Sequence, residues 1–407
     1  MSGFDISRVL AARAAAMPEA PIMRMSRLAR ELRAQGRDIV ALTLGEPDFD
    51  TPAVIRRAAC AALEEGHTHY PPLPGYPEVR AAIARKLKEE NGLDYGAEGI
   101  LVTGGAKQAL ANAIFALVEP GDEVILFAPY WSAYLPVIEL AGGRPVSVTA
   151  GAETGFLPRA EDISAAISDK SKLILLNSPC NPSGAVFPAA LLRAIADMVL
   201  AHPRLMVLAD EIYEYIVYDE ARHVSIGSLP GMLARTVTVN GFSKGFAMTG
   251  WRLGYAAAVP ELTRAMARMQ GTFTAGVNAF SQRAILTALA DDAARSAVND
   301  MRRRYATRRR LMFDLLKDIP GLHVRPPAGT FYMLPDASAL LENAADGLPR
   351  DDVALAEWLL FEHGVACVPG SAFGAPGCLR LSFATSEENI REACARLARG
   401  LNMLRGG

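Results

Sequence analysis

The amino-acid sequence predicts an α/β fold: a mostly parallel sheet sandwiched by helices in a large domain, plus a smaller α+β domain. Between about residues 97 and 260, short runs of Val, Ile and Leu alternate with Ala/Leu-rich helical stretches. Several runs are apolar at consecutive positions, as strands covered on both faces should be. The 407-residue chain is 51% hydrophobic and 21% charged, so it can fill more than one core.

The elements follow in a simple order. The first forty-five residues are helical up to RELRAQG and have no sheet of their own, so we expect them to pack on the C-terminal unit. After residue 290, one long helix is expected over 291–319, leading to AGTFYML and CLRLSFA. The predicted large domain is 46–290, and the small domain is discontinuous, formed by 1–45 and 291–407. The six expected strands lie at 100–102, 123–126, 173–176, 205–208, 236–239 and 253–256.

Charge and cysteine content exclude several classes of protein. Lys plus Arg (42) nearly balances Asp plus Glu (44), so neither nucleic acid nor a membrane surface is an expected partner. The run MRRRYATRRR is flanked by acidic residues and fits a solvated helix face. No apolar run reaches the roughly 18 residues of a membrane helix. Five cysteines without a CxxC pair fit a reducing cytoplasm, and His67 and His69 lack the further ligands of a metal site, so no metal is expected.

Chemically informative residues follow five of the expected strands. Because ligands of an open parallel sheet bind beyond the carboxyl ends of its strands, these loops are expected to converge on one site. Any one of them alone is weak evidence. The five loops are 104–108 (GGAKQ), 128–131 (APYW), 177–184 (NSPCNPSG), 210–213 (DEIY) and 240–244 (NGFSK).

The first loop has the features of an anion site. Gly104 and Gly105 allow close backbone approach, and the following helix offers N–H donors to a phosphate. The loop is neither GxGxxG nor a Walker motif, because no Ser or Thr follows Lys107. Taken alone, the loop is better explained as an ordinary strand-to-helix turn.

Lys244, Arg252 and Asp210 are the strongest candidates for chemistry. A lysine near another cation in an apolar site has a lowered pKa and can act as an amine nucleophile or base. Arg252 would stay charged and grip a phosphate. Asp210 ends an apolar run, so its carboxylate needs a cationic partner such as a protonated ring nitrogen. The alternatives are two surface cations after a strand and an acidic pair, Asp210 and Glu211, at a helix N-terminus.

These residues resemble the class I aminotransferases, fold-type I enzymes that use pyridoxal 5′-phosphate (PLP). Gly241-Phe242-Ser243-Lys244, followed by AMTGWRLG, fits the lysine-attachment pattern of that family. The similarity spans almost the whole chain and points to the bacterial aspartate aminotransferase-like subgroup. The matching segments, in order, are LGEPDFDTP, HTHYPPLPGYPEVRAAIA, PYW, NPSGAV, DEIY, AMTGWRLGY and LRLSFATSEENI.

For the cofactor, the resemblance implies a role for each loop. Lys244 would bind PLP covalently and later move a proton between the substrate and the cofactor. Asp210 would pair with the pyridinium nitrogen, while Tyr213 and Asn181 would hold the phenolic oxygen. Arg252 and the backbone of 105–107 would bind the phosphate. The implied catalytic residues are Lys244, Asp210 and Tyr213, and the implied cofactor-binding residues are Gly105, Ala106, Lys107, Trp131, Asn181, Asp210, Tyr213, Ser243, Lys244, Arg252 and Tyr70.

For the substrates, the resemblance implies an L-amino acid donor and a 2-oxo acid acceptor in a ping-pong reaction. Arg380 would bind the α-carboxylate, and Lys107 stands where the subgroup places a lysine for the distal carboxylate of aspartate, with 2-oxoglutarate as acceptor. Trp131 would stack on the ring. Tyr70 would reach the phosphate of the neighbouring subunit, which implies a homodimer with shared active sites. The implied substrate-binding residues are Gly45, Lys107, Trp131, Asn181 and Arg380.

Other functions remain open at this point. Apolar residues in 19–23 (EAPIM) would suit a larger donor, aromatic or branched-chain, and a C–S lyase would use the same lysine. GFSKG also satisfies the GxSxG motif of serine hydrolases, with His323 and His363 downstream. A PLP-sensing transcription regulator would need a DNA-binding domain for which the stretch before LGEPDF has no room.

Overall fold

The computed structural model describes residues 5–6, 9–15, 17 and 19–404. A seven-stranded sheet has the order β2-β8-β7-β6-β5-β3-β4. All neighbours are parallel except those of β8, which is antiparallel to both β2 and β7. The strands are β2 (Ile100–Thr103), β3 (Glu123–Ala128), β4 (Arg144–Thr149), β5 (Ser171–Asn177), β6 (Met206–Asp210), β7 (Thr236–Gly241) and β8 (Gly254–Ala257).

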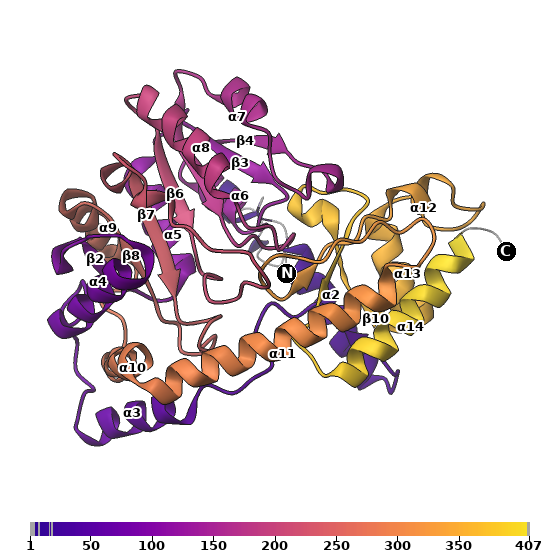
Figure 1. Cartoon of the computed structure of the whole chain (residues 1–407), viewed down its shortest axis with the longest axis horizontal. Coiled ribbons are helices and arrows are strands. Elements are labelled where there is room, and N and C mark those ends of the chain that lie inside the picture. The colour runs from indigo at the N-terminus through magenta and orange to yellow at the C-terminus, as the bar shows by residue number, and fades with distance from the viewer. Residues whose placement is uncertain (1–4, 7–8, 16, 18, 405–407) are drawn as a thin grey trace.

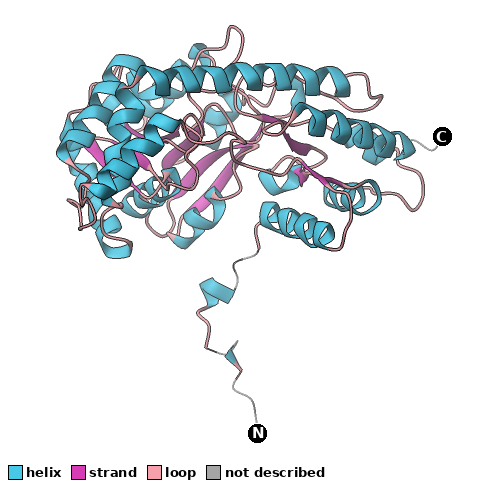
Figure 2. Ribbon diagram, turned by 90° about the horizontal axis from the view of Figure 1, so that it is seen from below, coloured by secondary structure: helices cyan, strands magenta, loops and turns pink. Residues whose placement is uncertain are grey.

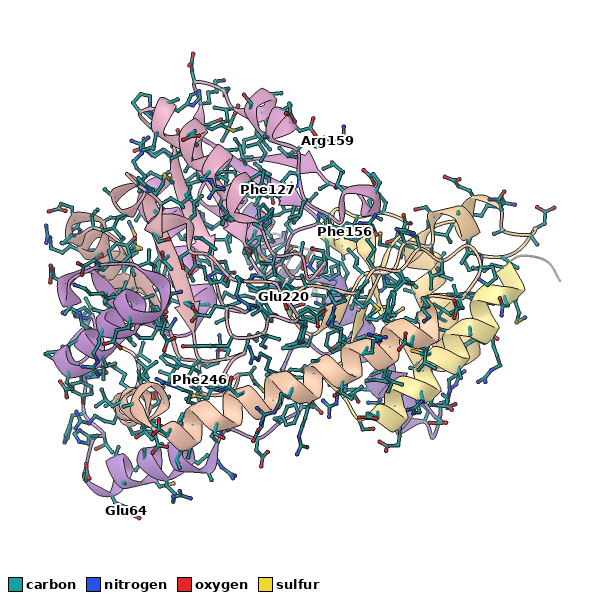
Figure 3. All side chains as sticks on the ribbon, viewed as in Figure 1. Glu64, Phe127, Phe156, Arg159, Glu220 and Phe246 are labelled. Carbon is teal, nitrogen blue, oxygen red and sulfur yellow. The ribbon has the colours of Figure 1, made fainter. Side chains whose placement is uncertain are left out.

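Helices cover both faces of this sheet (Figure 1). Because side chains alternate along a strand, Leu173 and Leu175 pack on one face, and Ile174 and Leu176 pack on the other. Phe127 and Phe246, both labelled in Figure 3, belong to separate apolar clusters: that of Phe127 includes residues of α8, and that of Phe246 includes residues of α10 and α11. The helices around the sheet are α3 (Ala53–Glu64), α4 (Pro77–Asn91), α5 (Ala106–Leu117), α6 (Tyr134–Leu140), α7 (Ala160–Ala166), α8 (Ala189–Ala201), α9 (Pro260–Phe273) and α10 (Ala279–Ala290).

A second core is built from both ends of the chain. The 25-residue helix α11 (Asp292–Leu316) runs from α10 to this core, as Figure 1 shows. The N-terminal region supplies β1 (Val40–Ala41), which pairs in parallel with β10 (Val365–Ala366). The remaining elements of this part are α2 (Pro21–Ala34), β9 (Tyr332–Met333), α12 (Ser338–Glu342), α13 (Asp352–His363), β11 (Val368–Pro369), β12 (Leu379–Ser382) and α14 (Glu387–Leu404).

The structure confirms the predicted fold class and the long helix, and it adds one strand, β4, to the large sheet. The sequence did not predict β4, which lies at the sheet edge and has exposed side chains at Arg144, Ser147 and Thr149 and only one fully buried residue, Val148. The short helix α1 (Ala12–Ala15) buries no side chain and projects from the body of the molecule (Figure 2). Over the described ranges, no helix is both long and apolar enough to cross a bilayer.

Candidate active site

A cavity of about 660 Å³ lies where the carboxyl ends of the parallel strands meet the second core. Its volume is in the range of small-molecule sites, and the chain segments that line it are far apart in sequence. The five loops singled out from the sequence therefore do converge. The predicted site residues that line the cavity are Gly45, Ala106, Lys107, Trp131, Asn181, Asp210, Tyr213, Ser243, Lys244, Arg252 and Arg380.

One corner of the cavity is built for an anion. Gly105, at φ 89°, precedes the first residue of α5, and a Cβ there would overlap Arg252 Nη2. Arg252 itself has a φ of 53°, a strained value for a residue with a side chain, and its Nη1 donates to the Thr249 carbonyl oxygen at 2.9 Å. The guanidinium and the N-terminus of α5 thus face the same corner.

Lys244 follows β7 and brings an amine to the centre of the site. Its Nζ donates a hydrogen bond to the carbonyl oxygen of Gly45. Burial lowers the pKa of Lys244 to about 8, with nearby Arg380 and Arg252 acting in the same direction against Glu46. A substantial fraction of the amine is therefore neutral near physiological pH, which is the form that attacks a carbonyl carbon or accepts a proton.

Asp210 ends β6 with only 3% of its surface exposed. Its Oδ2 accepts a hydrogen bond from Tyr134 Oη at 2.8 Å, and its Oδ1 accepts one from the Ile212 amide at 3.3 Å. Burial raises the pKa of Asp210 to about 6, although the Tyr134 hydrogen bond works against that rise. A buried carboxylate of this kind is stabilised by a protonated ring nitrogen.

Arg380 is the most deeply placed cation of the cavity, with 1% exposure. Its Nη1 donates to Asn181 Oδ1 at 3.2 Å and its Nη2 to the Thr43 carbonyl oxygen at 2.8 Å. Its buried Nε has no hydrogen-bond partner within the described part of the chain. The guanidinium carbon lies 4.5 Å from the ring centroid of Tyr332. The fork is held in place and carries unused donor capacity, as a carboxylate site requires.

Tyr213 lies beside this arginine. Its hydroxyl and that of Tyr332 are 3.0 Å apart, so one donates to the other. Burial and the Tyr332 hydroxyl raise the pKa of Tyr213 well above the ordinary tyrosine value. The phenol therefore remains a hydrogen-bond donor at any working pH.

The opposite end of the cavity combines one cation with an apolar wall. Lys107 Nζ lies 4.9 Å from the ring centroid of Trp131. Partial desolvation and, second, the charge of Arg252 lower the pKa of Lys107. We call the apolar residues at this end the side-chain wall; they are Met17, Ala20, Ile22, Met23, Pro136, Val137 and Leu140.

Three residues singled out from the sequence, Tyr70, His323 and His363, lie outside the main cavity. Tyr70 is 94% exposed and lines a separate hollow with His67 and His69, so a single chain does not bring it to the site. His323 contacts Asp336 and Arg325, and His363 packs on Trp358, whereas Ser243 lines the main cavity. The GxSxG motif therefore has no histidine base in place, and the hydrolase alternative is wrong on this geometry.

A second polar cluster lies behind the Asp210 loop. Glu211, Glu214 and His223 place potential metal-ligand atoms within 4.8 Å of one another. Lys86 Nζ, however, already pairs with Glu214, and His223 Nε2 lies 3.1 Å from Glu211. Burial opposes protonation of His223, but the charge and hydrogen bond of Glu211, together with the charge of Glu214, outweigh it and raise the histidine pKa. The cluster is thus a neutralised ion network that supports the loop.

The sequence analysis missed Tyr134 and Tyr332, which both line the cavity and contact predicted site residues. A signal for Tyr134 was present, because it lies three residues after Trp131 in the loop that follows β3. Tyr332 gave no comparable signal, since AGTFYML reads as an ordinary buried strand.

The residues present fit PLP. A buried carboxylate suits the pyridinium nitrogen, an amine with a lowered pKa suits the aldehyde, and the Gly105–Arg252 corner suits the phosphate. These three groups occupy one cavity. One cavity of this chain therefore offers a partner for the ring nitrogen, the aldehyde and the phosphate of PLP.

Known proteins that are similar to this chain are aminotransferases. A family model for "Aminotransferase class I and II" matches residues 37–397. The chain is 45% identical over 397 residues to an aspartate/prephenate aminotransferase of Thermus thermophilus, covering 97% of this chain and 99% of that protein. It is 43% identical over 405 residues to an aspartate aminotransferase of Pinus pinaster, covering 98% and 82% respectively.

Solved structures give the same result. The aspartate aminotransferase of Rhizobium meliloti superposes with a TM-score of 0.93 at 39% identity, covering 99% of this chain and 100% of that one. The Thermus thermophilus enzyme with maleate has a TM-score of 0.90 at 44% identity, covering 96% and 99%. The predicted resemblance and fold type are confirmed. The chain belongs to the class I and II aminotransferase family and is a PLP-dependent transaminase of fold type I.

Proposed function

We propose that the protein transfers the amino group of an acidic L-amino acid, aspartate first, to 2-oxoglutarate. The observation that carries this proposal is the pair of cations lining one cavity, Arg380 in its buried part and Lys107 beside Trp131. A dicarboxylic substrate offers one carboxylate to each. The names of the relatives support the choice, and the Thermus thermophilus structure was solved with maleate, itself a dicarboxylate.

The same cavity supplies the cofactor contacts. Lys244 would carry PLP, Asp210 would face its ring nitrogen, and Tyr213 with Asn181 would donate to its phenolic oxygen. Arg252 and the N–H groups at the start of α5 would bind the phosphate. When bound, PLP supplies an electron sink that makes the proton on the substrate Cα removable.

The chain's own residues then order the reaction. Arg380 would bind the α-carboxylate of the substrate. Its Nη1 also donates to Asn181, a proposed cofactor contact, so the substrate carboxylate and the cofactor would be held by connected residues. Lys244, whose pKa is about 8, would take the proton from the substrate Cα and return it to C4′ of the cofactor.

A second acceptor is favoured by the side-chain wall. Prephenate is a 2-oxo acid with a second carboxylate on a carbon ring, and it appears in the names of several relatives. Its ring would lie on Ile22 and Met23, and its second carboxylate would meet Lys107. Aromatic and branched-chain donors would use the same apolar residues.

A panel of amino donors tests the proposal. Each is mixed with the PLP-loaded enzyme, and the loss of cofactor absorbance is followed in a single turnover. Aspartate and glutamate should react fastest, and 2-oxoglutarate should restore the absorbance. An enzyme that reacts only with apolar donors would contradict the acidic assignment, and release of a thiol and pyruvate from a cystathionine-type substrate would favour a C–S lyase.

We also propose that the protein is a cytoplasmic homodimer. Each chain would have a large domain, 46–290, and a discontinuous small domain, 1–45 with 291–407. The support is the exposure of Tyr70, whose hydroxyl has no role within one chain's cavity, and of Ile6, Val9 and Leu10 on the projecting N-terminal segment. Light scattering should give twice the 43.5 kDa chain mass. Mixed dimers of Lys244→Ala and Tyr70→Ala chains should regain activity, because one of the two sites is then intact; a monomer, or mixtures without recovery, would contradict the shared site.

A further inference from the structure

Tyr134, the first residue of α6, donates the hydrogen bond to Asp210 noted above. Tyr134 is 2% exposed and Asp210 is 3% exposed, so water cannot replace this hydrogen bond for either group. The bond joins the start of α6, the helix that follows β3, to the end of β6; β3 and β6 are separated in the sheet by β5. A phenol donating to a buried carboxylate is a strong, charge-assisted contact.

The pleat of β6 explains why the two side chains meet. Val207 and Ala209 pack on the face covered by α8, whereas Leu208 packs in the cluster that contains Tyr134. Two residues further along the strand, Asp210 points to the same side as Leu208. An aspartate here faces an apolar layer, and the Tyr134 hydroxyl is the polar group that this layer provides.

Other groups around Asp210 act in both directions. The neighbouring charge of Glu211 disfavours the carboxylate, and that of Lys244 favours it. The Cys180 thiol and the Tyr213 phenol also face Tyr134, and both are buried with raised pKa values, so they stay neutral. Tyr134 is therefore the uncharged donor that favours the ionised form of Asp210 most directly.

We propose that Tyr134 is a positioning residue that holds Asp210 ionised and aimed at the ring nitrogen of the cofactor. This inference rests on the role proposed for Asp210. Tyr134 also packs edge-to-face on Trp131, with ring centroids 5.4 Å apart and planes at 89°. One side chain thus contacts both the Asp210 carboxylate and the Trp131 indole, and both residues line the same cavity.

Tyr95 provides a matched control. It is also a buried tyrosine of the same part of the molecule, with 6% exposure, but its hydroxyl donates to the backbone carbonyl oxygens of Leu233 and Thr236. Tyr95→Phe and Tyr134→Phe each remove one buried hydroxyl. If Tyr134 served only packing, the two variants would behave alike.

The experiment loads both variants and the parent with PLP labelled with ¹⁵N in the ring and records the ¹⁵N chemical shift. The parent and Tyr95→Phe should show a protonated nitrogen. In Tyr134→Phe the shared proton moves toward Asp210, so the shift should move toward that of an unprotonated nitrogen. The kcat should fall by about tenfold, the usual scale for a hydrogen bond to a charged group, while KM for the donor changes less than twofold.

Tyr134→Phe with the ¹⁵N shift and kcat of Tyr95→Phe would overturn the inference. If Tyr134→Phe does not fold, 4-fluorophenylalanine at position 134 keeps the side-chain volume without donating, and it should give the same ¹⁵N change. Asp210→Asn separates the two proposals: if it leaves the ¹⁵N shift of the parent unchanged, the role of Asp210 itself is wrong, whatever Tyr134 does.

Discussion

The two ends of the cavity are built differently. At the cofactor end, Asp210 and Arg380 are almost fully buried and lie on strands whose register fixes them. At the side-chain wall, Met17 is 48% and Met23 is 58% exposed, and they come from the start of α2 and the segment before it. The difference implies that the chemistry is fixed by the sheet, whereas substrate preference is set where substitutions cost little stability.

The largest effect is expected at Lys244. Lys244→Ala would remove the proposed attachment point of PLP and the proposed proton carrier, so kcat should fall by roughly 10⁴-fold or more. Steady-state kinetics measure this loss. Lys88→Ala, at an exposed lysine of α4, is the control and should match the parent. Activity within tenfold of the parent in Lys244→Ala would break the account of the cofactor end.

Arg380→Lys tests whether this end binds every substrate alike. A lysine keeps the charge but loses the planar fork, so KM should rise about a hundredfold for aspartate and phenylalanine together, in line with a buried charged pair. The comparison of the two donors is the measurement. A rise confined to aspartate would move Arg380 to the side-chain wall.

Cofactor uptake should depend on pH through Lys244. Because burial depresses its pKa to about 8, the neutral amine makes up about a quarter of the total at pH 7.5, against about one in a thousand for an ordinary lysine. The second-order rate of PLP binding to cofactor-free protein should therefore rise through pH 6–8 and level off above. Stopped-flow absorbance measures it; a rate still climbing steeply at pH 10 would contradict the lowered pKa.

Lys107→Met sharpens the contrast between the two ends. The variant should raise KM for aspartate by about tenfold, as expected for loss of one charged contact, and change KM for phenylalanine much less. Donor-specific kinetics give both values. Equal changes for the two donors would assign Lys107 to the phosphate corner instead.

The smallest effect is expected at Met23. Met23→Ser removes apolar surface from the side-chain wall, so kcat/KM for phenylalanine should fall by about three- to tenfold while that for aspartate is kept. Thermal stability should hardly change, because the residue is exposed. Loss of aspartate turnover as well would show that the wall orders the common part of the substrate.

The sequence identifies the polar residues at strand ends that line the cavity, but it misses one edge strand and two tyrosines, for physical reasons. Buried strands such as Leu173–Leu176 have no polar interruption, and polar residues at their ends stand out. The sequence does not predict β4, because this edge strand has only one fully buried residue and lacks the continuous apolar run of the central strands. The sequence does not identify Tyr134 and Tyr332 as site residues, because an aromatic residue in an apolar stretch is indistinguishable from a core residue until the partner of its hydroxyl is known. Tyr70 is exposed in a single chain, and the role we propose for it in a neighbouring subunit's site could not be tested from one chain.

The covalent bond to Lys244 is the central claim, and one measurement tests it directly. PLP-loaded protein is reduced with borohydride, digested, and analysed by mass spectrometry. We predict the cofactor mass on the peptide that contains Lys244, at close to one per chain. The same mass on another lysine, or on none, would contradict the account.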